Sequence, residues 1–362
     1  MFVAWRDLKF AKGRFALMGT VIVLITLLVG LLSGLTAGLG QQNISAITGL
    51  SADRIAFQAP SGGQEVSYSN STVTAKQWQQ WAKTPGVESA EPLGIITTKA
   101  TAGDRSTGVS AFGIQPGSRL APDSDKINGT SVVLSTTAAD DLGLRTGDAF
   151  TLAGNQLTVA AVKGDASFSH TPVIWTSLDV WQKTAPPTTG GDGPAATVIA
   201  LNTTSNTDLA ATDQAAGTKT VSKDDSLSAI GSYASENGSL QLMRGFLFAI
   251  SALVIGAFFT VWTIQRSGDV AVLKALGAST ANLLKDALGQ AVILLTGGTL
   301  IGTGIAAGLG ALVAGSAVPF LLTPATVLVP AAVMIALGAL GAALSIRRIT
   351  SVDPLTALGS AR

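Results

Sequence analysis

The chain has 362 residues, of which 47% are hydrophobic and only 12% charged, and its mean hydropathy is +0.44. This composition is typical of a membrane protein and argues against an ordinary soluble domain of this length. A net charge of +1 gives no field that would attract nucleic acid, and the absence of cysteine and of any histidine besides His170 excludes disulfides, thiolate metal sites and multi-histidine sites within one chain.

Four apolar segments are long enough to cross a membrane as helices, which takes about 20 residues. The spans are expected at residues 15–39, 240–264, 288–313 and 325–346. The first segment could instead be a cleaved signal peptide, because basic residues precede it. Its apolar core is longer than is typical of such signals, which favours a membrane anchor.

Ten lysine and arginine residues near the span ends fall on one side of the membrane if the chain crosses four times. The positive-inside rule therefore places the amphipathic segment 1–14, the loop 265–287 and the C-terminal segment 347–362 in the cytoplasm. The uncharged loop 314–324 and the insert 40–239 are expected outside. The basic residues are Arg6, Lys9, Lys12, Arg14, Arg266, Lys274, Lys285, Arg347, Arg348 and Arg362.

The insert is long enough to fold as a separate domain. Alternating apolar residues predict strands in RIAFQA (54–59), LTVAAV (157–162) and ATVIAL (196–201), whereas AKQWQQWAK (75–83) predicts a short helix. The stretch 130–162 predicts a strand, a helix, a turn and two more strands. The expected fold class is an α-helical membrane protein with four transmembrane helices and a mixed α/β extracellular domain between the first two.

No pattern in the insert indicates catalysis. The aspartates of the pairs 140–141 and 224–225 point in different directions on any regular element, so solvated surface is favoured over acid–base chemistry. A surface or hydrogen-bonded role is favoured for His170 over that of ligand or base, and Ser167 and Ser169 beside it do not complete a triad. We therefore expect a protein that is not an enzyme.

Small residues recur every four positions on two spans. The first span carries Gly30, Gly34 and Gly38, and the third has a similar stripe from Gly298 to Gly310. Such stripes allow helices to approach closely. Two interpretations stay open for the first span: packing within the bundle, and contact with a second copy of the chain.

The polar stretch VWTIQRSGDVAVLKALGASTANLLK (261–285) separates the second and third spans. Its SGD residues (267–269) suit the start of a short helix, and Gly277 is placed to end that helix in a left-handed conformation. Ser279 or Thr280 can cap the next helix, which continues into the third span. A helix lying here against the cytoplasmic surface can transmit force to two spans at once.

Three features of the sequence resemble the MacB/FtsX-like permeases, the type VII group of ATP-binding cassette (ABC) transporters. They are DVAVLKALGAS (269–279), the Asp286-x-x-x-Gln290 pattern and the closing RRITSVDPLTAL (347–358). The four-span layout with a large insert matches as well, so the resemblance covers the whole chain. Within the group, MFVAWRDLKFAKGRFALMG and LLSGLTAGLGQQNISAI are similar to haem-exporting permeases of the HrtB type.

The resemblance implies a non-catalytic permease that works by mechanical transmission in the lipid bilayer. The chain has no G-x-x-x-x-G-K-[ST] phosphate loop, so ATP would be bound by a separate ATPase, two copies of which would pair with two copies of this chain. Part of the loop 265–287 is expected to contact the ATPase; the alternative is that it is an ordinary charged loop. The coupling residues expected there are Asp269, Leu273, Lys274, Leu276, Gly277 and Lys285.

The resemblance also implies haem as the substrate, captured laterally from the outer leaflet, with no permanently bound cofactor. Met243 and Glu236, seven residues apart on one helical face, are the candidate ligands of the haem iron, and Arg244 can pair with a propionate. In the alternative interpretation, Met243 is a packing residue, Glu236 is a solvated carboxylate and Arg244 is a headgroup anchor. Two other functions stay open: export of another amphiphile (lipid, peptide or antibiotic), and FtsX-like control of an extracellular hydrolase, which exposed apolar residues on the insert would favour.

Overall fold

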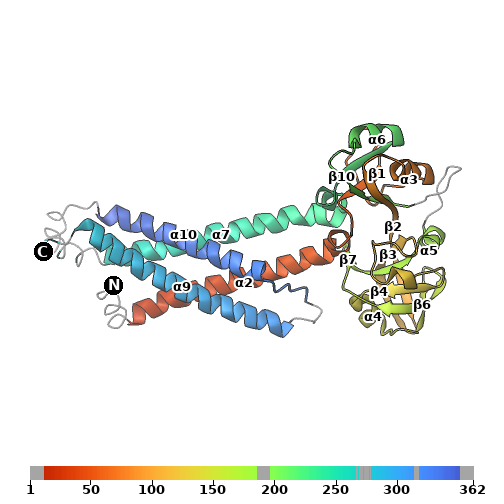
Figure 1. Ribbon diagram of the computed structural model, residues 1–362. Helices are drawn as coiled ribbons and strands as arrows, with labels where there is room; N and C mark the ends of the chain where they lie inside the picture. The colour runs from red at the N-terminus through yellow and green to blue at the C-terminus, as the bar shows by residue number, and fades with distance from the viewer. Residues whose placement is uncertain are drawn as a thin grey trace. The chain divides into compact units, whose positions relative to one another are not determined.

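The computed structural model (Figure 1) describes residues 12–185, 196–265, 268, 272, 277, 279–313 and 318–350. The chain divides into two compact units. One contains Met1–Gly38 and Ser239–Arg362 and is helical, and the other, Leu39–Gly238, is mixed α and β. Most of the predicted N-terminal helix and of the C-terminal segment lies outside the described residues.

Within the described residues, four long helices are apolar enough to cross a membrane. They are α2 (Lys12–Thr48), α7 (Gly231–Gln265), α9 (Thr280–Val313) and α10 (Pro324–Thr350). The helix α2 continues well past the predicted end of the first span because Ala46 and Ile47, in its last turns, are buried in the core of the α/β unit. The helix α7 likewise begins before the predicted second span.

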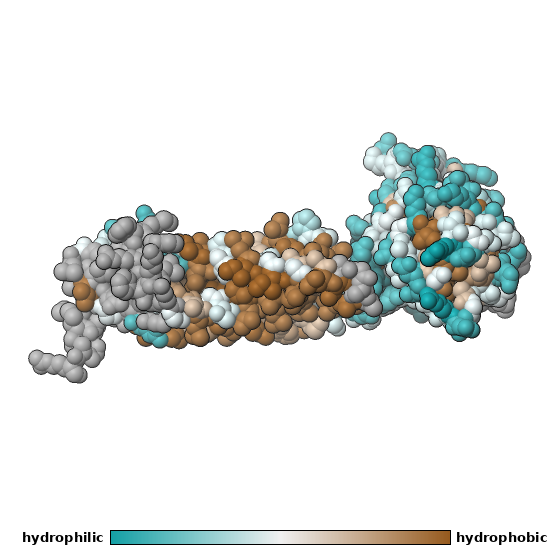
Figure 2. Space-filling view, turned by 90° about the horizontal axis from the view of Figure 1, so that it is seen from below, coloured by the Kyte–Doolittle hydropathy of each residue, from teal (hydrophilic) through white to brown (hydrophobic). Residues whose placement is uncertain are grey.

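The helical unit is apolar on the outside as well as inside. Figure 2 shows a nearly continuous brown surface over its helices, and large apolar side chains such as Leu253, Leu312 and Leu344 are more than two-thirds exposed. Such a surface would promote aggregation in water but is the normal lipid-facing surface in a bilayer. Its interior contains Phe15, Phe259 and Trp262, whose rings make edge-to-face contacts.

The glycine stripe of α2 faces the interior of this bundle. A Cβ atom added at Gly30 would lie 2.9 Å from the Cβ of Ala306, and one at Gly34 would lie 2.2 Å from the ring of Phe320. At Gly38 it would lie 1.9 Å from the carbonyl oxygen of Pro319. The stripe is thus covered by α9 and by the segment leading into α10, which leaves no room there for a second copy of the chain. Close packing within the bundle accounts for these glycines.

The α/β unit is built on one extended sheet. Its strand order is β10-β1-β9-β2-β3-β8-β4-β6-β5, with β7 paired to β8. An additional pairing of β2 with β5 closes β2, β3, β8, β4, β6 and β5 into a ring. The strands are β1 (Arg54–Gln58), β2 (Val87–Ala102), β3 (Arg105–Ile114), β4 (Ser131–Leu134), β5 (Ala149–Leu152), β6 (Asn155–Val162), β7 (Ser167–Phe168), β8 (Thr171–Ser177), β9 (Val198–Thr203) and β10 (Thr218–Ser222).

Short helices cover this sheet: α3 (Ala75–Ala82), α4 (Thr136–Leu142), α5 (Leu178–Thr184) and α6 (Leu209–Ala216). The strands and helices expected in this unit are confirmed, including the strand–helix–strand–strand order of 130–162. The core is aromatic, with Phe168 in edge-to-face contact with Tyr68 and Phe112. Burial raises the pKa of the Tyr68 hydroxyl, an effect opposed by its hydrogen bond to Ser226.

Two cross-strand glycines make room for a tryptophan. Gly94 of β2 and Gly113 of β3 pair across the sheet, and a Cβ at either position would lie within 2.4 Å of Trp181 on α5. We expect Gly94→Ala to destabilise the protein by about 1–3 kcal/mol, because the ring would have to move.

Thermal unfolding of the purified protein, followed by tryptophan fluorescence, measures this effect. Gly108→Ala on β3 is the matched control, since its Cβ would meet only the Thr171 methyl group at 3.9 Å. Equal unfolding midpoints for the two variants would show that Trp181 does not pack on the bare backbone at Gly94.

Candidate functional site

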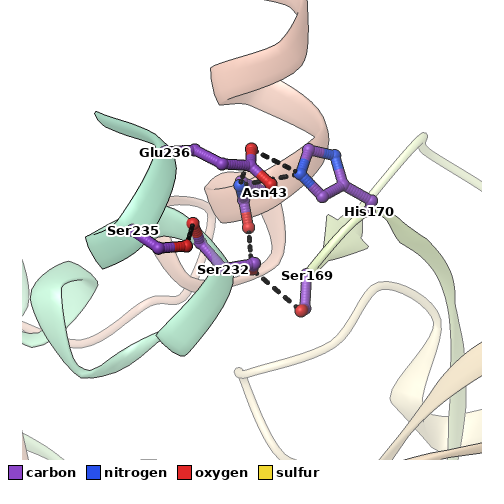
Figure 3. A network of polar contacts seen from close by, with 6 residues as sticks. All are labelled: Asn43, Ser169, His170, Ser232, Ser235 and Glu236. Carbon is purple, nitrogen blue, oxygen red and sulfur yellow. Dashed lines mark hydrogen bonds and ion pairs between the residues drawn. The ribbon is translucent and has the colours of Figure 1, made fainter. Parts of the chain in front are cut away.

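Six polar residues form a connected cluster where the end of α2, the start of α7 and the β7–β8 turn meet (Figure 3). We call it the Asn43 cluster. All six belong to the α/β unit. Its members are Asn43, Ser169, His170, Ser232, Ser235 and Glu236.

The β7–β8 turn presents His170 in a conformation that is costly for its residue type. Ser169 and His170 are the central residues of a two-residue hairpin and have φ values of +50° and +62°. Turns of this kind normally use Asn-Gly, because L-residues with side chains disfavour positive φ. The turn is held against α2, since the Ser169 and His170 amides donate to the carbonyls of Asn43 (3.0 Å) and Gln42 (3.2 Å). The surrounding contacts therefore over-determine the strained backbone.

Asn43 is buried and its amide group is fully oriented. Its Oδ1 accepts a hydrogen bond from the Ser232 hydroxyl, so its Nδ2 faces Glu236 and His170. The Nδ2 group donates to Glu236 Oε2 at 3.2 Å. Since the Ser232 proton is directed to Asn43, the Ser169 hydroxyl, 2.9 Å away, is the donor to Ser232.

His170 and Glu236 are in direct contact at 2.8 Å between Nε2 and Oε2. A carboxylate oxygen at this distance requires a proton on Nε2, and the pair carries opposite charges only when the ring is protonated. The side chains are 31% and 43% exposed, so the pair is open to a ligand from solvent or from a membrane surface. No serine of the cluster bonds to the imidazole, and the described residues contain no group of three or more metal-ligating side chains.

The cluster brings together only one of the predicted substrate-binding residues, Glu236. Met243, 46% exposed, and Arg244 lie further along α7 in the helical unit. The Nε atom of Arg244 is buried and has no hydrogen-bond partner among the described residues. Asn43 was missed by sequence reasoning because it is 193 residues from Glu236, although it lies within the stretch LLSGLTAGLGQQNISAI that carries the resemblance.

The predicted coupling loop is described only in part. Gly277 has φ +90°, in the positive range expected of it, and the Ser279 hydroxyl accepts from the Asn282 amide at 3.3 Å, as expected for the cap of α9. Lys285 is exposed. The other residues expected to contact an ATPase, Asp269, Leu273, Lys274 and Leu276, lie outside the described residues.

Two family models match the chain. The MacB-like periplasmic core domain matches residues 15–219, and the FtsX-like permease C-terminal domain matches residues 242–354. Two solved structures resemble part of the chain. The periplasmic region of MacB from Actinobacillus actinomycetemcomitans has a TM-score of 0.35 at 12% identity, over 50% of this chain and 94% of that one. The extracellular domain of the ABC-type transporter YknZ from Gram-positive bacteria has a TM-score of 0.32 at 14% identity, over 46% and 89%.

Relatives are similar over their whole length. A Staphylococcus haemolyticus protein with the provisional name hemin transport system permease protein HrtB is 26% identical over 99% of both chains. A Staphylococcus epidermidis protein with the same name is 25% identical, and an uncharacterised ABC transporter permease of Mycobacterium bovis is 24% identical, each over 99% of both chains. The MacB-like match spans more than half of the chain and the FtsX-like match covers most of the rest. The chain therefore belongs to the MacB/FtsX-like permeases of ABC transporters, multi-pass membrane proteins with an extracellular domain between the first two spans.

Proposed function

We propose that this permease exports haem, which it captures laterally from the outer leaflet of the membrane and releases outside when a separate ATPase binds ATP. The provisional names of the staphylococcal relatives, which align end to end with this chain, support haem as the substrate. One observation carries the proposal: Glu236 lies on the same continuous helix as Met243, and two hydrogen-bond donors, Asn43 and His170, hold its carboxylate.

Glu236 and Met243 are our proposed ligands of the haem iron. They are seven residues apart on α7, a spacing that places two side chains on one face of a helix. Arg244, whose Nε lacks a partner within the described structure, is the proposed contact of a haem propionate. Carboxylate and thioether groups both occur as metal ligands, and charged guanidinium groups pair readily with carboxylates.

Mechanical transmission is the proposed mode of action. The termini and the loop that contains Gly277 would lie in the cytoplasm, where Asp269, Leu273, Lys274, Leu276 and Lys285 would contact the ATPase. Two permease copies would pair through surfaces other than the glycine stripe of α2, which is filled within one chain.

Signalling to an extracellular hydrolase is supported less well. Such a permease would dock its partner through apolar residues on the extracellular domain. Among the described residues from 39 to 238, no large hydrophobic side chain is exposed, and Figure 2 shows the surface of this unit as mostly teal and white. The described surface of the α/β unit therefore does not favour apolar docking of this kind.

Titration of the purified protein with ferric haem tests the substrate. We expect a saturable Soret band, and a loss of affinity of about tenfold or more in both Glu236→Ala and Met243→Ala, because each removes an iron ligand. Glu65→Ala and Leu242→Ala are the matched controls, an exposed glutamate of the same unit and the exposed neighbour of Met243. No binding by the parent would exclude haem and leave another amphiphile as the substrate, whereas unchanged binding in both variants would exclude these ligands.

A further inference from the structure

The contacts of Glu236 assign a role to the single histidine of the chain. We propose that His170, together with Asn43, is a positioning residue: it holds Oε2 of Glu236 so that Oε1 is presented to the iron of the substrate. The inference rests on the proposed function, because it takes Glu236 as an iron ligand.

The two oxygens of Glu236 have different surroundings. Oε2 accepts from His170 Nε2 at 2.8 Å and from Asn43 Nδ2 at 3.2 Å. None of the hydrogen bonds that described residues make to Glu236 involves Oε1. A free glutamate loses rotamer freedom when it binds a metal, and this cost falls if other donors already fix the carboxylate. Hydrogen-bond donors to the far oxygen of a ligating carboxylate act in this way.

An ordinary exposed ion pair does not explain the arrangement. Such pairs join flexible side chains and contribute little to stability. Here the imidazole is placed by a backbone with positive φ that is tied to α2, and the second donor, Asn43, is 2% exposed and oriented by Ser232. The Asn43 donor and the backbone that carries the His170 donor are therefore fixed before any substrate arrives.

Asn43 also gives His170 a second partner. Its Nδ2 atom lies 3.0 Å from His170 Nε2, within hydrogen-bond distance. When Nε2 carries its proton, that proton goes to Glu236. If Glu236 turns away and the imidazole proton resides on Nδ1, the second amide hydrogen of Asn43 can bond to Nε2. The carboxylate can thus leave the cluster without leaving the imidazole nitrogen unpaired.

The test compares His170→Leu with His170→Gln in the full-length protein. Neither side chain is β-branched, so both carry similar backbone strain at φ +62° and differ mainly in the amide donor of glutamine. We expect His170→Leu to weaken ferric haem binding about 10–100-fold, with an unfolding midpoint within about 2 °C of the parent. His170→Gln should bind close to the parent value, because its amide can donate to Oε2.

Ser228→Ala is the matched control, since Ser228 is exposed, lies outside the Asn43 cluster, and its hydroxyl donates to the Asp225 carbonyl in its own turn. It should bind haem like the parent. If Glu236→Ala weakens binding but His170→Leu does not, the positioning role is wrong and the proposed function stands. A fall in affinity shared equally by the leucine and glutamine variants, together with a lower unfolding midpoint, would indicate a structural role and overturn the inference. If the parent binds no haem, the proposed function fails and the inference fails with it.

Discussion

Replacing Gly38 by alanine is expected to destabilise the helical unit by about 1–3 kcal/mol or more. The added Cβ would lie 1.9 Å from the Pro319 carbonyl oxygen, a backbone atom that no side-chain rotation can move aside. The segment before α10 is also tied to α2 directly, because the Leu321 amide donates to the Gly34 carbonyl at 3.0 Å. Displacing this segment would break that bond and shift Phe320, whose ring fills the space beside Gly34 and Gly310.

The change is measured by heating the purified protein in detergent and following the remaining monodisperse fraction by size-exclusion chromatography. Gly40→Ala, on the same helix, is the control: no atom lies within 4 Å of its added Cβ. Alanine there should leave stability unchanged or raise it by up to about 1 kcal/mol, since alanine is the better helix former. Equal stability of the Gly38 and Gly40 variants would mean that the segment before α10 does not pack on α2.

Replacing Gly277 by valine is expected to reduce ATP-driven transport about tenfold or more, equivalent to a coupling defect of about 1.4 kcal/mol. Gly277 has φ +90°, a region that a β-branched residue adopts only with strain. Within the described part of the chain, no atom beyond its immediate neighbours lies within 4 Å of an added Cβ, so we attribute the effect to the backbone and not to a clash. We expect the chain reversal before α9 to change shape and to lose its fit to the ATPase.

ATP hydrolysis by the copurified ATPase and haem efflux from cells are the two readouts for Gly277→Val. Gly289→Val is the control, because Gly289 lies within α9 and also has open space around its Cβ position. Gly277→Asn should be milder, since asparagine tolerates positive φ better than valine does. Full transport by the valine variant would show that this turn does not couple hydrolysis to the spans.

The features that the sequence predicts well are set by residues that are close together in the sequence. Uninterrupted apolar runs are sufficient for the four spans, and the left-handed Gly277 and the Ser279 cap are local backbone choices. The strands of the α/β unit follow in the same way from alternation and turn residues, as at β1 and β6. The glycine stripe of α2 was recognisable too, but its partner was not, because Pro319 and Phe320 come from an unpatterned loop.

The Asn43 cluster depends on contacts across the chain. Glu236 is 66 residues from His170 and 193 from Asn43, and no spacing rule links them. The turn Ser169-His170 also lacks the Asn-Gly signal of a two-residue hairpin, because carbonyls of α2 stabilise it. The two readings of Glu236 available from sequence, solvated carboxylate and iron ligand, therefore both missed its partners.

ATP-driven export of haem is tested most directly by measuring cell-associated haem in bacteria that express this permease with its ATPase and are loaded with haem. We expect the parent to lower membrane-associated haem, and Glu236→Ala and Gly277→Val each to abolish this effect while the proteins stay in the membrane. Equal haem in cells with the parent and with the Gly277→Val variant would contradict ATP-driven export of haem by this chain.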